Sequence, residues 1–137
     1  HRMNIEDLAM RISDLTSFDG YQLECQPIPG EIDVLQITVG DFDELPTYVS
    51  VTDTQILCIT YLFTEDEVKP ESRTEMLEEM LELNIPIPLS AFSKIGERYV
   101  IFGALSVSSS IEDIGHEIIT LTENAVESIT ALEDYLR

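Results

Sequence analysis

The sequence predicts an α+β fold, in which three helices pack with an antiparallel sheet of about five to six strands, in the order α-β-β-β-β-α-β-β-α. Four strand patterns follow one another over residues 21–63, joined by links short enough for an antiparallel meander. An apolar segment at 98–107 then leads directly into one long amphipathic helix. Because no repeat or linker interrupts the pattern, residues 3–137 are expected to form a single α+β domain. His1 and Arg2 precede Met3 and resemble a tag remnant.

The first helix is expected over residues 4–16. The side chain of Asn4 can cap its start, with Asp7 three residues further on. One apolar stripe follows the helical period: Ile5, Leu8, Ala9, Ile12 and Leu15. The Asp19-Gly20 pair ends this segment.

Four strands are expected at 21–26, 33–39, 47–52 and 55–63. The links between them are a turn at 27–30, an acidic loop at 40–46 and a reversal at Asp53 and Thr54. The last of these strands is apolar on both faces, as is the later strand at 98–107. We expect these two to lie in the middle of the sheet.

The second half supplies two helices and two strands. Pro70 suits the first turn of a helix that continues until the Ile85-Pro86-Ile87-Pro88 run stops it. Its expected buried stripe is Met76, Leu77, Met80, Leu81 and Leu83. A short edge strand at 89–92 and a turn at 94–97 precede the strand at 98–107. The last helix is expected to start with a capping box of Ser109 and Glu112 and to run for about 26 residues, roughly 39 Å.

Strands with two apolar faces need cover on both sides of the sheet. Helices can cover one face, and the second face needs either a helix moved across or a second copy of the chain. The sequence therefore favours a homodimer that buries the second face of the sheet or the long helix.

The composition is strongly acidic. The chain holds 27 Asp and Glu against 7 Lys and Arg, a formal net charge of −20. Such a field repels nucleic acid and anionic lipids and attracts basic proteins or cations, although it also serves simply to prevent aggregation. No segment has membrane-spanning length and no signal peptide is recognised, so a cytoplasmic protein without membrane insertion is expected. Cys25 and Cys58 lack CxxC spacing and are expected to be buried free thiols.

Several motifs invite a functional interpretation, but each has a simpler one. The acidic groups Asp41, Asp43 and Glu44, and likewise 65–67, lack the pattern of an EF-hand loop. His116 has no second native histidine beside it and is interpreted as a surface residue. Serines 108–110 have no GxSxG context and are explained by helix capping. Gly103 is expected to permit a close approach of a helix or strand. No catalytic residue, metal or cofactor is predicted.

The C-terminal block carries a resemblance to a known family. Residues 99–106 (YVIFGALS), 110–114 (SIEDI) and 123–125 (ENA), with 88–90 (PLS) before them, resemble the YjfI-like family of small acidic bacterial proteins. The resemblance is specific over about residues 85–128. It implies no catalytic residues, because the family has no assigned activity. It does imply a partner similar to phage shock protein A, a helical membrane-remodelling protein. The element order also resembles type III secretion chaperones and the YbjN-like fold.

The resulting hypothesis is a non-enzymatic, chaperone-like or adaptor module that binds a protein partner in envelope stress, and the resemblance implies the phage-shock-protein-A-like protein as that partner. Its predicted contacts lie on the last helix: Glu123, Glu127, Ile129, Leu132, Glu133, Asp134, Tyr135 and Leu136. Ordinary core or dimer packing explains the apolar members equally well. The competing hypothesis is a small carboxylate-dependent or metal-dependent hydrolase, in which Asp41, Asp43 and Glu44 converge on a cavity.

Overall fold

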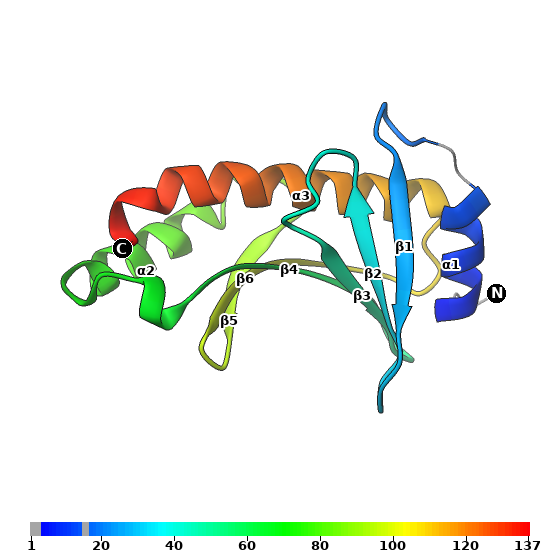
Figure 1. Ribbon diagram of the computed structural model, residues 1–137, viewed down its shortest axis with the longest axis horizontal. Helices are drawn as coiled ribbons and strands as arrows, with labels where there is room; N and C mark the ends of the chain where they lie inside the picture. The colour runs from blue at the N-terminus through cyan, green and yellow to red at the C-terminus, as the bar shows by residue number, and fades with distance from the viewer. Residues whose placement is uncertain (1–3, 15–16) are drawn as a thin grey trace.

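A computed structural model describes residues 4–14 and 17–137 and confirms the α+β class (Figure 1). Six strands form one antiparallel sheet in the order β1-β2-β3-β4-β6-β5. These strands are β1 (Leu23–Ile28), β2 (Val34–Val39), β3 (Thr47–Val51), β4 (Ile56–Thr64), β5 (Ala91–Ile95) and β6 (Arg98–Leu105). The two strands with two apolar faces, β4 and β6, are neighbours inside the sheet, as the sequence predicts.

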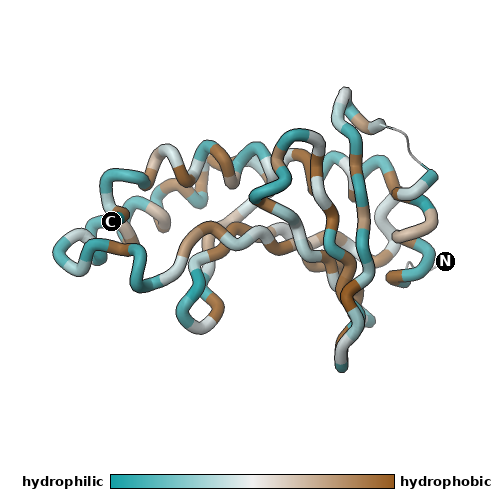
Figure 2. The backbone as a smooth tube through the Cα atoms, in the orientation of Figure 1, coloured by the Kyte–Doolittle hydropathy of each residue, from teal (hydrophilic) through white to brown (hydrophobic). Residues whose placement is uncertain are grey.

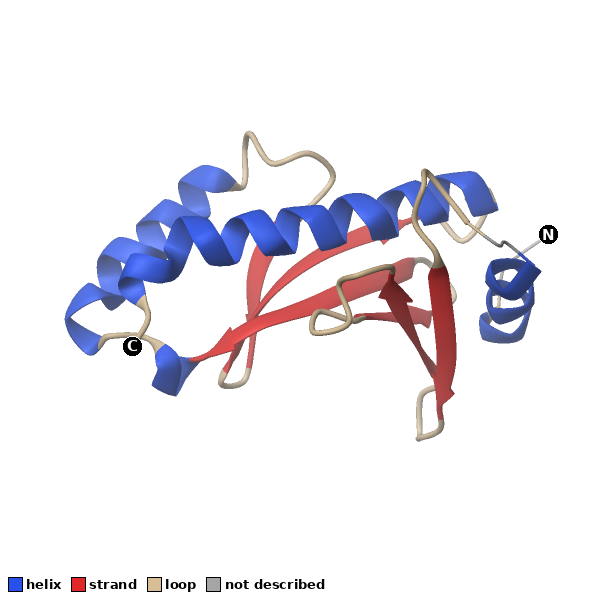
Figure 3. Ribbon diagram, turned by 45° about the horizontal axis from the view of Figure 1, so that its top comes forward, coloured by secondary structure: helices blue, strands red, loops and turns tan. Residues whose placement is uncertain are grey.

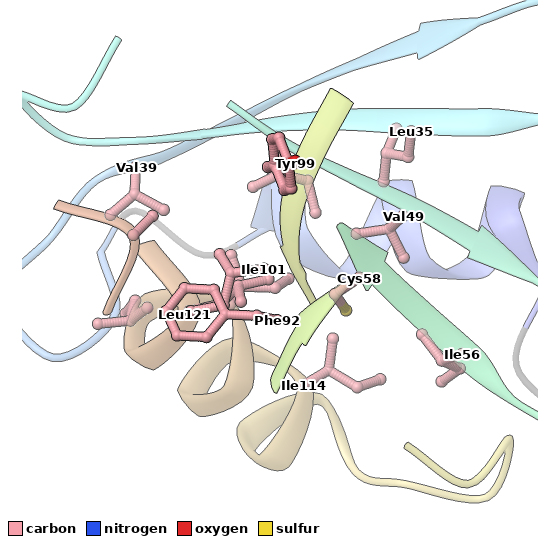
Figure 4. Close-up of a cluster of buried hydrophobic side chains, with 14 of the residues drawn as sticks. Leu35, Val39, Val49, Ile56, Cys58, Phe92, Tyr99, Ile101, Ile114 and Leu121 are labelled. Atoms are coloured by element: carbon pink, nitrogen blue, oxygen red, sulfur yellow. The ribbon is translucent and has the colours of Figure 1, made fainter. Parts of the chain in front are cut away.

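The long helix α3 (Ile111–Leu132) crosses one face of the sheet from end to end (Figures 1 and 3). The core lies between this helix and the inward side chains of the strands, because alternate strand residues face the helix. Figure 4 shows Ile114 and Leu121 of α3 beside Cys58 and Ile101 of the sheet, and all four are fully buried.

The two shorter helices lie on the same side of the sheet as α3. Helix α1 (Ile5–Asp14) packs on β1, where Ala9 accepts a hydrogen bond from the Cys25 thiol at 3.7 Å. Cys25 pairs with the core residue Ile37, so α1 shares the α3 face. Asn4 caps α1 by accepting the Asp7 backbone N–H at 2.8 Å, as predicted. Helix α2 (Arg73–Leu83) runs beside the C-terminal half of α3 (Figure 3) and buries Met76 and Met80.

Some predicted boundaries are wrong. The first strand begins at Leu23 instead of Tyr21, and it continues through Pro27, which an edge strand tolerates. The strand predicted at 89–92 occupies Ala91–Ile95, because Leu89 has a φ of 64° and cannot be extended. Ser110, not Ser109, caps α3 by accepting the Asp113 N–H at 3.1 Å.

The helices also differ from the prediction at their ends. Helix α3 has 22 residues, and a 3₁₀ turn at Glu133–Tyr135 follows it instead of a further helical turn. Leu81 belongs to the predicted buried stripe of α2, but its side chain is 70% exposed, because α2 lies at the β5 edge of the sheet and is covered on one side only. Leu15 of the predicted α1 stripe lies outside the described residues.

The opposite face of the sheet carries no helix within the described part of the chain (Figure 3). Its side chains, among them Tyr48, Ile59, Tyr61 and Phe102, are half-buried by their neighbours in the sheet. Of the two coverings that the sequence allows, a helix moved across the sheet is not found among residues 4–14 and 17–137.

Candidate functional site

A groove separates the β2–β3 loop from the C-terminal half of α3. It encloses about 540 Å³. Phe42 and Leu45 of the loop and Val126 and Ile129 of the helix give it apolar walls, and all four are half-buried. The loop takes its shape at Gly40, whose φ of 43° favours glycine, and Phe42 then donates its backbone N–H to the Val39 carbonyl at 2.9 Å.

The rim of this groove is acidic. Asp41, Asp43 and Glu44 all line it, and all three are exposed. On the helix side, Glu123 and Glu127 are exposed, within one helical turn of the apolar wall residue Val126. We name the apolar walls and these five carboxylates together the acidic groove. Its shape and charge suit a basic amphipathic helix, since such a helix offers one apolar face flanked by cations.

Tyr21 connects the two sides of the acidic groove. Its hydroxyl donates to Glu123 Oε2 at 3.2 Å, and its ring lies 6.0 Å from that of Phe42. The negative charge of Glu123 and this hydrogen bond raise the pKa of Tyr21 above its ordinary value. Glu123 thus positions the loop that forms the opposite wall, as well as adding charge to the rim.

The other predicted contact residues have separate environments. Leu132 is fully buried in the core. Tyr135 donates its hydroxyl to Glu79 at 3.0 Å, and Leu136 pairs with Val68 in an isolated bridge, so both fasten the end of the chain. Glu133 and Asp134 are exposed beyond the last turn of α3. Of the apolar set, Ile129 alone lines the acidic groove.

The remaining sequence motifs have structural roles. The carboxylate of Glu65 accepts hydrogen bonds from Arg73 and from the Tyr99 hydroxyl and pairs with Lys94 at 3.1 Å. Burial acts against the charged form, but these contacts outweigh it and lower the pKa of Glu65. His116 is exposed, 3.9 Å from Asp19. Within residues 4–14 and 17–137, no three His, Cys, Asp or Glu side chains form a group suited to a metal ion.

A buried carboxylate under α3 is the feature that the sequence analysis missed. Glu117 is 4% exposed, and its Oε2 atom has no hydrogen-bond partner. It points at Gly103 of β6, where an added Cβ would lie 2.6 Å from Oε2, so the predicted close approach at Gly103 is confirmed. Burial, and secondarily the nearby Glu117, raises the pKa of the Cys58 thiol to about 12. The available signal was the position of Glu117 in the apolar stripe, three residues after Ile114 and four before Leu121.

Glu117→Gln is expected to stabilise the protein at neutral pH, because glutamine carries no charge in a site where burial disfavours the charged form. Burial raises the pKa of Glu117, although His116 opposes the shift. Between the ordinary pKa of a glutamate and this raised value, the folded chain holds a proton that the unfolded chain releases, so stability falls as pH rises through that window. Glutamine removes this loss, and the difference should vanish toward pH 4 (about the ordinary Glu pKa).

Urea unfolding of both proteins across this pH range measures the difference. Glu127→Gln makes the same chemical change at an exposed position of the same helix and should leave the pH dependence unaltered. Identical pH profiles for the wild type and Glu117→Gln would contradict a buried, unpaired carboxylate.

No helix among the described residues is both long and apolar enough to cross a membrane. Figure 2 colours each residue by its hydropathy and shows hydrophilic and hydrophobic residues interspersed along α3, which agrees with this observation.

Comparison with known proteins identifies the family. The model of the family described as "Uncharacterized protein conserved in bacteria (DUF2170)" matches residues 2–136. The chain is also 30% identical over 105 residues to the "Uncharacterized protein YjfI" of Escherichia coli strain K12, covering 74% of this chain and 77% of that protein. The protein of the same name from Escherichia coli O157:H7 matches to the same extent. The chain therefore belongs to the DUF2170 family, and its YjfI-like resemblance is confirmed.

Proposed function

We propose that this member of the DUF2170 family is a non-enzymatic protein-binding module whose acidic groove receives a basic amphipathic helix of a partner protein. One observation carries the proposal: apolar walls from two distant segments, at 42–45 and 126–129, meet between exposed carboxylates. An apolar face of a helix fills such a groove, and flanking cations pair with the rim.

The partner suggested by the YjfI-like resemblance is a helical protein similar to phage shock protein A, in the cytoplasm and in the context of envelope stress. The acidic groove requires that this partner offer a helix with an apolar stripe and basic flanks. The net charge of −20 would increase the rate of encounter with such a helix, because long-range fields mainly steer association.

The alternative, a carboxylate-dependent or metal-dependent hydrolase, has weaker support. A hydrolase requires carboxylates that converge in a water-excluding cavity with shifted pKa values. The structure gives Asp41, Asp43 and Glu44 exposed positions on a rim, which suits long-range attraction of a cationic partner better than acid–base chemistry.

The triple variant Asp41→Asn, Asp43→Asn, Glu44→Gln is expected to slow association with a purified phage-shock-protein-A-like protein about tenfold or more at low salt. The dissociation rate should change less, because the apolar walls remain. The salt dependence of association should also flatten, since the Debye length is only about 10 Å at 0.1 M. Stopped-flow or surface-based kinetics at several salt concentrations measure both rates.

A matched control separates the groove from the total charge. Glu71→Gln, Glu78→Gln, Glu82→Gln removes three exposed charges at the α2 end of the molecule. If this control slows association as much as the groove variant, total charge and not the acidic groove steers the partner. Unchanged association by the groove variant would exclude the site.

A further inference from the structure

The helix-free face of the sheet is nearly devoid of charge. Its outward positions follow from the strand register, since directly paired residues share a face. Across β2, β3, β4 and β5 these positions hold no Asp, Glu, Lys or Arg, and the whole six-stranded face has two charged residues, Glu24 in β1 and Arg98 in β6. We name this surface the uncharged sheet face.

Aromatic and aliphatic side chains fill the centre of the uncharged sheet face. The rings of Tyr48 and Tyr61 meet edge to face at 5.6 Å, and the Arg98 guanidinium covers the Tyr61 ring at 4.9 Å. Ile59 pairs directly with Tyr48 on one side and Phe102 on the other. A hollow of about 380 Å³ opens here. The surface therefore resembles the inner face of a β-sandwich that lacks its second sheet.

The distribution of charge indicates what covers this face. With 27 acidic residues in the chain, an acid-free area across the five adjacent strands β2, β3, β4, β6 and β5 is a marked exception to the rest of the surface. A basic partner would gain from acidic contacts here and finds none. A partner of the same strongly negative charge requires a contact without carboxylates, because unpaired like charges are costly when desolvated. A second copy of this chain is such a partner.

We propose that two copies of this protein associate through the uncharged sheet face, with Tyr48, Ile59, Tyr61 and Phe102 of each copy packed between two aligned sheets. Helix α3, which forms one wall of the acidic groove, lies on the opposite side of the sheet (Figure 3), so the groove stays free in both copies. The dimer would present two acidic grooves facing outward, which increases the avidity for a partner with repeated helices. This surface is distinct from the acidic groove, so either proposal can fail alone.

Light scattering or sedimentation of the full chain, up to hundreds of micromolar, measures the self-association at about 0.1 M and about 1 M salt. The Debye length falls from about 10 Å to about 3 Å between these conditions. Repulsion between two copies of net charge −20 is then screened, so the dimer should tighten with salt. This is the reverse of the salt effect expected for the acidic groove. A monomer at every concentration in both salts would overturn the proposal, as would a dimer that weakens with salt.

Charge introduced into the face gives the second test. Ser50→Glu places a carboxylate beside the hollow, and Gln36→Glu adds one isosterically next to Tyr48, with little risk to the fold. Each should raise the dimer dissociation constant about tenfold or more, while circular dichroism reports an intact fold. Ser108→Glu, an exposed residue in the loop before α3, is the matched control and should leave the dimer unchanged. A dimer that persists in both face variants, or dissociates equally in the control, places the interface elsewhere.

Discussion

Gly103→Val is expected to lower the free energy of unfolding by roughly 2–4 kcal/mol, because β6 and α3 leave no space for a side chain there. An ideal Cβ at Gly103 would lie 2.6 Å from Oε2 of Glu117 and 3.1 Å from the backbone carbonyl oxygen of Leu89. The Glu117 carboxylate must shift, and the Leu89 carbonyl cannot easily do so, because it belongs to a segment fixed on α3, where Asn124 donates to Pro88 O at 2.9 Å. Valine therefore forces the helix from the sheet.

Chemical denaturation of the variant and the wild type measures this loss. Ala104→Val introduces the same side chain at the next residue, which is exposed on the other face, and should cost far less. Glu117→Ala combined with Gly103→Ala should be more stable than the sum of the single changes predicts, because removing the carboxylate empties the space that the new Cβ enters. Additive effects would mean that Glu117 does not limit this approach.

Local patterns in the sequence were sufficient to predict the fold class and the order of the secondary-structure elements. Alternation in β2 and the helical period of α3 each reflect burial on one side of a regular element, and this information is local. The errors occur where the decisive interaction is distant. The Ala91–Ile95 strand begins late because Leu89 and Ser90 are held against α3, where Asn124 donates to Ser90 Oγ at 3.0 Å.

The candidate site was predictable only in part. Glu123, Glu127 and Ile129 were identified from the last helix, and the 41–44 loop was noted for its charge, but no pattern links two segments about eighty residues apart. Their contact depends on the turn at Gly40 and on the bond between Tyr21 and Glu123. The two strands with apolar residues on both faces indicated that both faces of the sheet must be covered. The pattern of apolar residues does not reveal which face the helices cover.

The two surfaces predict salt effects of opposite sign, which makes the mechanism testable in one titration. The acidic groove attracts a cationic partner at long range, so added salt should slow that encounter. The uncharged sheet face joins two equally charged bodies, so added salt should favour it. A partner with repeated helices would then be bound most tightly at intermediate salt, where dimers form and steering persists.

Leu132→Ala is expected to lower the free energy of unfolding by about 2–5 kcal/mol and to leave partner dissociation unchanged while the protein stays folded. Leu132 is fully buried beneath α3, so truncation creates a cavity in the core and does not alter the acidic groove. Ile129→Ala, three residues earlier on the same helix, removes a wall of the groove from a half-buried position. It should cost less stability and raise the dissociation rate about tenfold.

Thermal unfolding and dissociation kinetics of the two variants, measured against the same purified phage-shock-protein-A-like protein, separate packing from binding. The pair is matched in helix, region and loss of an aliphatic side chain, and it differs in whether the side chain faces the sheet or the groove. A raised dissociation rate in folded Leu132→Ala would mean that partner binding depends on how the core-facing side of α3 is packed. An unchanged rate in Ile129→Ala would remove the apolar walls from the binding site and leave the carboxylates alone to account for any attraction.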